Sequence, residues 1–181
     1  MNRIIKILII LLCIALVISI YHHIITKNKN KEIEEYEPEE EISDAQERQT
    51  LISLYFLNKT TGGVEPEARL MDVKELVRDP YIVLLNMLIE GPKNNSLQAI
   101  IPNGTKVNNV TLNNDTLVID FSGEFTMVSG KEMEEKVIDS IVKTLTELTE
   151  VNSIKILIDG EENKAFEDGE VTFEMEFIRE D

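Results

Sequence analysis

The sequence is poor in the side chains on which most enzymes depend. Its single cysteine, Cys13, and its two histidines, His22 and His23, all lie in or directly after the first apolar segment. The rest of the chain therefore has no thiol and no imidazole, which excludes a Ser-His-Asp triad, a Cys-His dyad and a His-ligated zinc site there. Neither a P-loop nor a dinucleotide-binding glycine motif is present. We expect a protein that is not an enzyme, with no catalytic, cofactor-binding or metal-binding residues and no cofactor.

Basic residues are scarce outside the N-terminal region. The formal net charge is −16, yet residues 1–31 carry five basic side chains and no acidic one, so the remainder carries −21. A surface this acidic repels phosphate backbones, whose binding requires Lys and Arg. We therefore expect no nucleic-acid partner.

One long stretch lacks charge altogether. Residues 7–26 contain no charged side chain, and a helix of that length spans the roughly 30 Å hydrocarbon layer of a bilayer. The sequence predicts a transmembrane anchor at 7–26 after a cytoplasmic tail at 1–6. Val17-Ile18-Ser19 is a poor signal-peptidase site, so we favour a retained anchor, and Leu12 before Cys13 does not fit a lipoprotein signal.

The basic residues on the two sides of this span are nearly balanced, so they decide the orientation poorly. The short N-terminal tail and the signal-like order favour a cytoplasmic N-terminus. We predict a single-pass protein of the cell membrane whose C-terminal domain is extracytoplasmic.

An acid-rich segment follows the apolar one. Glu32–Gln49 is dense in acidic side chains and has Pro38 in its middle, so it cannot bury enough apolar surface to fold alone. We interpret residues 27–49 as an acidic flexible stalk that holds a folded domain, residues 50–178, away from the lipid. The alternative is a segment that binds cations or basic peptides.

The first half of the domain contains two predicted strands and one predicted helix. Leu51–Leu57 is a continuous apolar run with aromatic residues, and Ala68–Lys74 is a shorter strand candidate. Asp79 is positioned to cap a helix that has Pro80 at its first position and ends before Gly91.

The segment Ile101–Phe125 predicts a turn and a β-hairpin. Pro102-Asn103-Gly104 is a turn sequence, and Asn113-Asn114-Asp115 is a hairpin loop candidate. After this loop, apolar side chains alternate with others, which gives a strand one buried face: Leu117, Ile119 and Phe121.

The clearest predicted helix follows. Ser129 to Glu132 fits a capping box, with Val128 and Met133 positioned as a hydrophobic staple. From Met133 to Leu148, apolar residues recur every three or four positions and predict a face that packs on a sheet. We expect the polar residues between them to face water: Glu134, Lys136, Asp139 and Lys143.

Two more strands are predicted near the C-terminus. Ser153–Asp159 is an apolar run that ends in a turn at Asp159-Gly160. Val171–Ile178 alternates, which places the following side chains on one face: Val171, Phe173, Met175 and Phe177.

Two carboxylates are the best candidates for chemistry. Asp120 and Glu124 flank Phe121-Ser122-Gly123 and could serve as a general acid and base or hold a cation. No nucleophile or electrophile accompanies them, so we favour a structural role in the strand and the following loop. The alternative is a cell-wall-active enzyme that uses the Asp120/Glu124 pair.

Several short segments follow one another along residues 51–160. They are Leu54-Tyr55-Phe56-Leu57, Glu67-Ala68-Arg69, Leu88-Ile89-Glu90-Gly91-Pro92, Ile101-Pro102-Asn103-Gly104-Thr105, Val118-Ile119-Asp120-Phe121-Ser122, Glu124-Phe125, Ser140-Ile141-Val142-Lys143-Thr144-Leu145, Val151-Asn152-Ser153-Ile154 and Asp159-Gly160. In order and spacing they resemble the GerMN domain of bacterial sporulation and spore germination proteins.

This resemblance implies an α+β fold, in which a single small domain has a mixed sheet packed by two helices, as in the ring-building folds of secretion-type channels. It also implies a place outside the cytoplasmic membrane. We expect a non-enzymatic interaction or assembly module that acts in sporulation or spore germination. Its expected partners are envelope proteins or further copies of itself.

Overall fold

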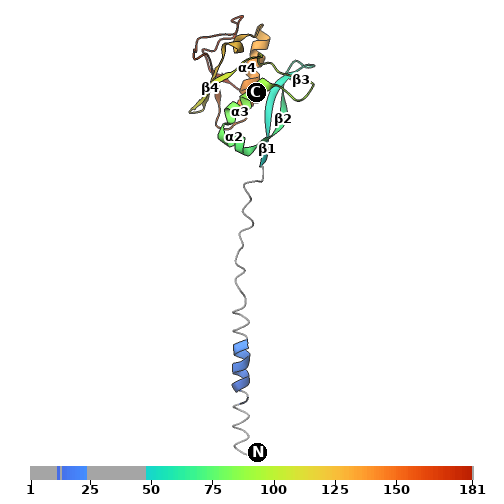
Figure 1. Cartoon of the computed structure of the whole chain (residues 1–181), viewed down its shortest axis with the longest axis vertical. Helices are drawn as coiled ribbons and strands as arrows, with labels where there is room; N and C mark the ends of the chain where they lie inside the picture. Colours follow the sequence, from blue (N-terminus) through green and yellow to red (C-terminus); the bar gives the residue numbers. More distant parts are fainter. Residues whose placement is uncertain (1–11, 13, 24–47, 181) are drawn as a thin grey trace, which may run out of the picture. The chain divides into compact units, whose positions relative to one another are not determined.

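The computed structural model describes residues 12, 14–23 and 48–180 (Figure 1). The chain divides into two units, Met1–Gln46 and Glu47–Asp181. In the first unit, residues 12 and 14–23 are helical, and no helix among the described residues is long and apolar enough to span a bilayer. The predicted anchor at 7–26 lies partly outside the described residues. Cys13, the tail at 1–6 and nearly all of the stalk at 27–49 lie outside them, so these assignments stay predictions.

The second unit begins with a three-stranded sheet in the order β2-β1-β3. Strand β1 (Gln49–Asn58) confirms the strand predicted at 51–57, and it pairs antiparallel with β2 (Val64–Asp72) and with the short β3 (Leu97–Gln98). The second strand was predicted too late, at 68–74, because Asp72 ends it. The Asp72 carboxylate accepts a hydrogen bond from the Lys74 backbone N–H (2.8 Å) and starts the unpredicted helix α2 (Val73–Arg78).

Helix α3 (Pro80–Glu90) confirms the helix predicted to begin at Pro80 and to end before Gly91. Pro80 occupies its first turn, and Asp79 is the N-cap residue but makes no side-chain capping bond. Gly91 ends the helix with φ at 97°, a conformation that favours glycine. The leucines Leu84, Leu85 and Leu88 bury the apolar face of α3 in the core.

The second sheet has four strands in the order β4-β5-β6-β7, so the expected single mixed sheet is in fact two sheets. The predicted hairpin is confirmed as β4 (Val107–Asn113) and β5 (Thr116–Phe121), with Asn114 at φ 58° in its loop. Strand β6 (Ser153–Ile158), also predicted, runs parallel to β5, and β7 (Phe177–Ile178) is antiparallel to β6. This second sheet is the mixed one.

A 3-10 turn, η1 (Gly123–Thr126), and helix α4 (Lys131–Leu145) connect β5 to β6. The predicted capping box is wrong, because Gly130 is the N-cap residue and Glu132 instead forms an ion pair with Lys136, one turn further along the helix. Gly130 has φ at 90°, and its N–H donates to the Asp168 carboxylate (2.7 Å). In Figure 1, α3 and α4 lie between the β1–β2 pair and β4.

The strand predicted over 171–178 is also wrong. Only Phe177 and Ile178 are in a strand, and Met175 is 75% exposed whereas Phe173 is fully buried, so these two side chains do not share a face. The reason is an aromatic cluster. Phe173 and Phe166 meet edge to face (4.9 Å between ring centroids), and both contact Phe125, which stacks on Phe121 at 4.3 Å. The chain bends to bring both rings into the core.

Candidate interaction site

The two carboxylates considered for catalysis belong to separate turns. The Asp120 carboxylate accepts a hydrogen bond from the Gly160 backbone N–H (2.9 Å) and supports the confirmed turn after β6. Glu124 lies beside Gly104 and has a lowered pKa, first because the Ser122 hydroxyl hydrogen-bonds to its carboxylate, and also because of its own backbone N–H and Lys106. A general acid requires a raised pKa, so Glu124 is poorly suited to that role.

Among the described residues, no group of three or more His, Cys, Asp or Glu side chains could hold a metal ion. The turn at Asp159-Gly160 has both residues at positive φ, 50° and 80°. Its acidic neighbours Glu161 and Glu162 are exposed, and Glu161 pairs with Lys164 at 3.0 Å. Residues 159–162 therefore form a solvent-exposed turn.

A groove of about 610 Å³ runs between α4 and the C-terminal residues, and we call it the α4 groove. Its apolar lining combines the buried Ile138 and Val142 with side chains from the C-terminal residues: Val171, Phe177 and Ile178. Its charged lining comes from one face of α4 and from the end of the chain: Glu132, Glu135, Lys136, Asp139, Lys143 and Glu180.

The two lysines of the α4 groove are engaged within α4 itself. Lys143 pairs with Asp139 at 2.7 Å, and Lys136 pairs with Glu132, each across one helical turn. Their side chains are only 26% and 23% exposed, so both ammonium groups are held against the helix surface. The lysines therefore neutralise neighbouring acids on the same wall and leave the groove with a net negative lining.

The C-terminal side of the α4 groove is fixed at both ends of the helix. Near the start of α4, the Glu134 carboxylate accepts a hydrogen bond from the Val171 N–H (2.8 Å). Glu134 is fully buried, so its expected exposure is wrong, and its second oxygen has no hydrogen-bond partner among the described residues. Just beyond the end of α4, Glu147 accepts a hydrogen bond from the Arg179 guanidinium at 2.9 Å.

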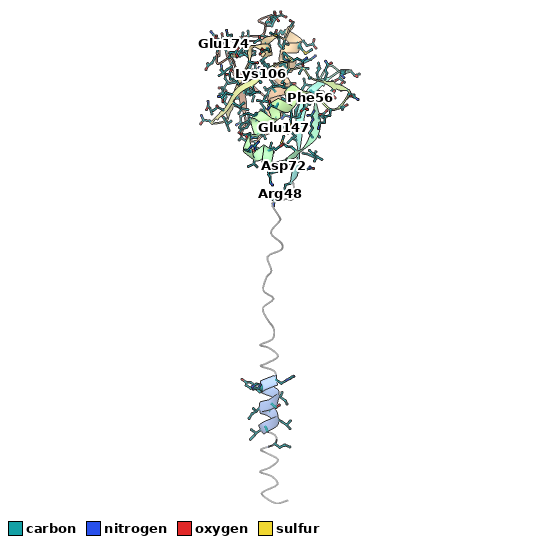
Figure 2. The ribbon with its side chains drawn as sticks, viewed as in Figure 1. Arg48, Phe56, Asp72, Lys106, Glu147 and Glu174 are labelled. Atoms are coloured by element: carbon teal, nitrogen blue, oxygen red, sulfur yellow. The ribbon has the colours of Figure 1, made fainter. Side chains whose placement is uncertain are left out.

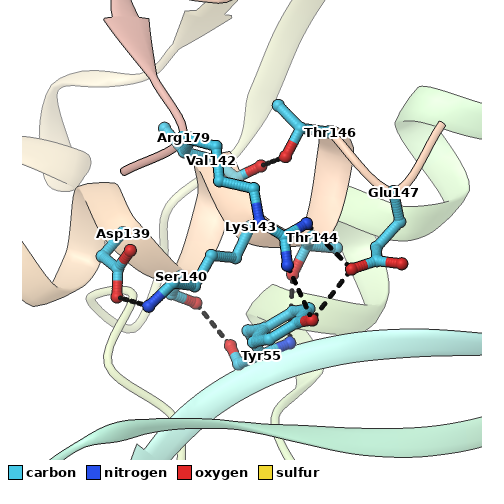
Figure 3. A network of polar contacts seen from close by, with 9 residues as sticks. All are labelled: Tyr55, Asp139, Ser140, Val142, Lys143, Thr144, Thr146, Glu147 and Arg179. Carbon is cyan, nitrogen blue, oxygen red and sulfur yellow. Dashed lines mark hydrogen bonds and ion pairs between the residues drawn. The ribbon is translucent and has the colours of Figure 1, made fainter. Parts of the chain in front are cut away.

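Figure 3 shows how Arg179 joins three parts of the fold. Its guanidinium contacts the Glu147 carboxylate, donates to the Tyr55 hydroxyl (3.3 Å) and lies 5.6 Å from the centre of the Tyr55 ring. The Tyr55 hydroxyl in turn donates to Glu147 (2.8 Å). Hydrogen bonds from Arg179 and then from Tyr55 lower the pKa of Glu147, whereas burial, followed by the bond to Glu147, raises the pKa of Tyr55.

The backbone of Tyr55 is held by α4 rather than by another strand. Its N–H donates to the Thr144 hydroxyl (3.0 Å), and its carbonyl accepts from the Ser140 hydroxyl (2.5 Å) (Figure 3). These two buried hydroxyls satisfy the backbone groups where β1 has no strand on that side. These hydrogen bonds to the Tyr55 backbone explain why Ser140 and Thr144 occur on the packed face of α4.

A second cluster, Glu67 with Arg69, holds the loop after α3. Arg69 is 5% exposed, contacts Glu67 at 2.6 Å, donates to the Gly91 carbonyl (2.5 Å) and lies over the Phe56 ring, which Figure 2 labels. Burial raises the pKa of Glu67, but bonds from the Asn94 N–H and from Arg69 outweigh it, so that its pKa is lowered. This cluster therefore fixes the loop after α3 against β2.

The outer face of the β1–β2 pair carries few charges for so acidic a chain: Asp72 shares it at one end, and Arg179 lies over the Tyr55 ring at the other. Leu51 pairs with Leu70, Ser53 with Ala68 and Tyr55 with Pro66, and these six side chains share that face. Leu51 and Leu70 are 68% and 64% exposed. Among the described residues, the outer edge of β2 has no strand partner, because β2 ends its sheet.

Sequence reasoning missed the polar residues that organise this site, Arg69, Glu134 and Arg179. Arg69 lies two positions before Met71 in β2, and in a strand that spacing assigns both to the same buried face. Glu134 lies four residues before Ile138 and therefore on the packed stripe of α4. No local signal marks Arg179, whose partner Glu147 is 32 residues away.

This arrangement of two small sheets around α3 and α4 defines a class, the GerMN-type α+β domain. The first GerMN domain of the sporulation protein GerM from Bacillus subtilis has a TM-score of 0.62 and 27% identity, over 73% of this chain and 99% of that one. The structure of the tandem GerMN domains of the same protein has a TM-score of 0.61 and 25% sequence identity to this chain. The match covers 73% of this chain and 46% of that one.

The family is shown by sequence as well. The model of the Germane family, described as sporulation and spore germination, matches residues 53–164, and the chain belongs to this family. Spore germination protein GerM of Bacillus subtilis (strain 168) is 32% identical over 87 residues, which are 48% of this chain and 24% of that protein. The chain thus matches only about a quarter of that relative's length.

Proposed function

We propose that this chain is a non-enzymatic interaction module of the cell envelope that acts in sporulation or spore germination. Its residues 50–178 form the GerM-like domain, which docks onto envelope proteins or onto further copies of the chain. Family membership supports the physiological setting. The protein-binding role is supported by the surface of the domain.

The observation that carries the binding role is the exposed apolar pair on the outer face of the β1–β2 pair, Leu51 and Leu70. Exposed apolar side chains that cluster on one face of a soluble domain are typical of protein contact sites. Here Leu51 and Leu70 lie directly opposite each other, and the neighbouring edge of β2 offers unpaired backbone groups. Pro66 on that edge removes one donor and limits uncontrolled strand pairing.

The placement at the membrane belongs to the same proposal. The charge-free residues 7–26 anchor the chain in the cell membrane as a single pass, and the acidic stalk at 27–49 carries the domain on the outside. A fusion of a periplasm-active reporter enzyme after residue 181 tests the topology. Activity of this fusion, with none from a fusion that lacks residues 1–31, supports the orientation; an inactive full-chain fusion that is present in the membrane overturns it.

Site-specific photo-crosslinking in sporulating cells tests the binding role. A photoreactive amino acid at Leu70 is expected to capture an envelope protein or a second copy of the chain. Met127 is the matched control, because it is equally exposed at 64% and lies outside the β1–β2 pair. Equal yields at the two positions, or no product at Leu70, would contradict docking through this face.

A further inference from the structure

The α4 groove has the dimensions of a site for an extended polypeptide. One wall is α4 from Glu132 to Lys143, which extends for about 17 Å at 1.5 Å per residue. The other wall includes β7, which ends its sheet and has no strand on its outer side among the described residues. An extended segment rises about 3.3 Å per residue, so about five residues fill this length.

The interior of the groove offers apolar contacts that the fold leaves partly open. Ile138 and Val142 are 7% and 3% exposed and form its base, while Ile178 is 66% exposed at its side. Burial of this exposed isoleucine by a partner removes apolar surface from water and is therefore favourable. Apolar side chains from a partner can therefore pack along Ile178 and reach the base of the groove.

The charge around the groove selects the partner. Four acidic side chains line it against two lysines, and both lysines are already paired with α4 acids. Glu180 has no ion pair among the described residues, and residues 159–180 as a whole carry nine acidic and two basic side chains. Such a surface favours basic partners over acidic ones, including acidic copies of this chain.

We propose that the α4 groove binds an extended segment of another envelope protein in which apolar side chains alternate with lysine or arginine. The segment lies along β7, as in strand addition at a sheet edge. Its apolar side chains point into the groove, and its basic side chains point to Glu180 and to Glu135, whose own ion pair with Lys131 is long (3.9 Å) and exposed. This site builds on the proposed interaction role but uses residues other than those of the β1–β2 face.

A peptide-binding experiment tests the proposal with the full-length chain in detergent micelles. The probe is a fluorescein-labelled, end-capped heptapeptide in which four lysines alternate with three valines, and binding is followed by fluorescence anisotropy. A peptide of the same composition with its lysines in one block is the control for alternation. We expect the alternating peptide to bind at least about tenfold more tightly at low salt.

Paired charge reversals locate the site. Glu135→Lys with Glu180→Lys is expected to weaken binding by about tenfold, because both acids line the groove. Glu75→Lys with Glu162→Lys changes the net charge equally at exposed acids outside the groove and is expected to weaken binding by less than about threefold. Ile178→Ala, a change at an exposed position, is expected to weaken binding by about threefold without loss of folding.

Two results would overturn the groove proposal: equal loss in both double variants, or equal binding of the alternating and blocked peptides. Either would mean that the acidic surface attracts any polycation. If photo-crosslinking at Leu70 still captures a partner, the interaction role stands and only the α4 groove is excluded. If the peptide binds as expected and crosslinking at Leu70 fails, the groove stands and docking through the β1–β2 face is excluded.

Discussion

Glu134 is the sharpest test of how the C-terminal residues are held. Its carboxylate is fully buried, one oxygen accepts a hydrogen bond from the Val171 N–H (2.8 Å), and the other has no partner in the part of the chain that the structure describes. Glu134→Ala leaves the Val171 N–H without its acceptor, at a cost of about 1–3 kcal/mol. The cavity adds about 1 kcal/mol, and removal of a buried carboxylate with an unpaired oxygen returns about 1 kcal/mol. We expect a net destabilisation of about 2 kcal/mol.

Urea unfolding measures this change. At a slope of about 2 kcal/mol per molar urea, the midpoint of Glu134→Ala falls by about 1 M with the slope unchanged. Glu134→Gln keeps the volume and the acceptor for Val171, so its stability should stay within about 1 kcal/mol of the wild type. Hydrogen exchange should quicken at Val171 in the alanine variant only. An alanine variant as stable as the wild type, or a glutamine variant as unstable as the alanine one, would refute this reasoning.

Three further substitutions probe other contacts. Arg69→Met leaves Glu67 and the Gly91 carbonyl without their buried partner and should cost about 3 kcal/mol in chemical denaturation. Gly91→Ala forces a side chain into φ 97° and brings its Cβ within 3.2 Å of the Ala99 Cβ, so we expect a loss of about 2 kcal/mol and a lower Tm. The pKa of Glu147 is lowered in the fold, so its ionised form stabilises the fold at pH values above the ordinary pKa of a carboxyl group. This contribution is lost as the pH falls through the lowered pKa. Because the Glu147 and Arg179 side chains are about 40% exposed, the contribution is below about 1 kcal/mol, and Arg179→Ala should flatten the acid limb of a stability-versus-pH profile by no more than that.

Local sequence patterns predicted those helices and strands that neighbouring residues specify by themselves. The β4–β5 hairpin, α3 and β6 follow from alternation, a proline at a helix start and a glycine at its end. The same patterns failed where a distant contact decides. Phe173 was assigned to the same face as Met175 by alternation, but packing against Phe166 and Phe125 turns the chain before a strand can form.

The candidate site is harder to predict than the fold, because an acidic residue type suggests solvent even where the position of the residue lies on the packed face of a helix. Glu134 was expected in solvent because it is acidic, although it precedes Ile138 and Ile141 by four and seven residues and shares their stripe. A charged residue at such a position is buried only if a partner satisfies it. In this chain the partner is a backbone N–H from residues that alternation had assigned to a strand.

The contacts that shape the α4 groove share one physical property, which is long separation in sequence. Asp168 reaches the Gly130 N–H across 38 residues, Glu134 reaches Val171 across 37, and Arg179 reaches Glu147 across 32. In two of these pairs a side chain bonds to a backbone N–H, so the residue type identifies only one of the two partners. The three contacts hold the C-terminal residues at both ends of α4, and the weaker, more exposed one lies beside Ile178. If a partner segment opens the groove, the Arg179 end should therefore loosen first, and hydrogen exchange at residue 178 should change before exchange at residue 171.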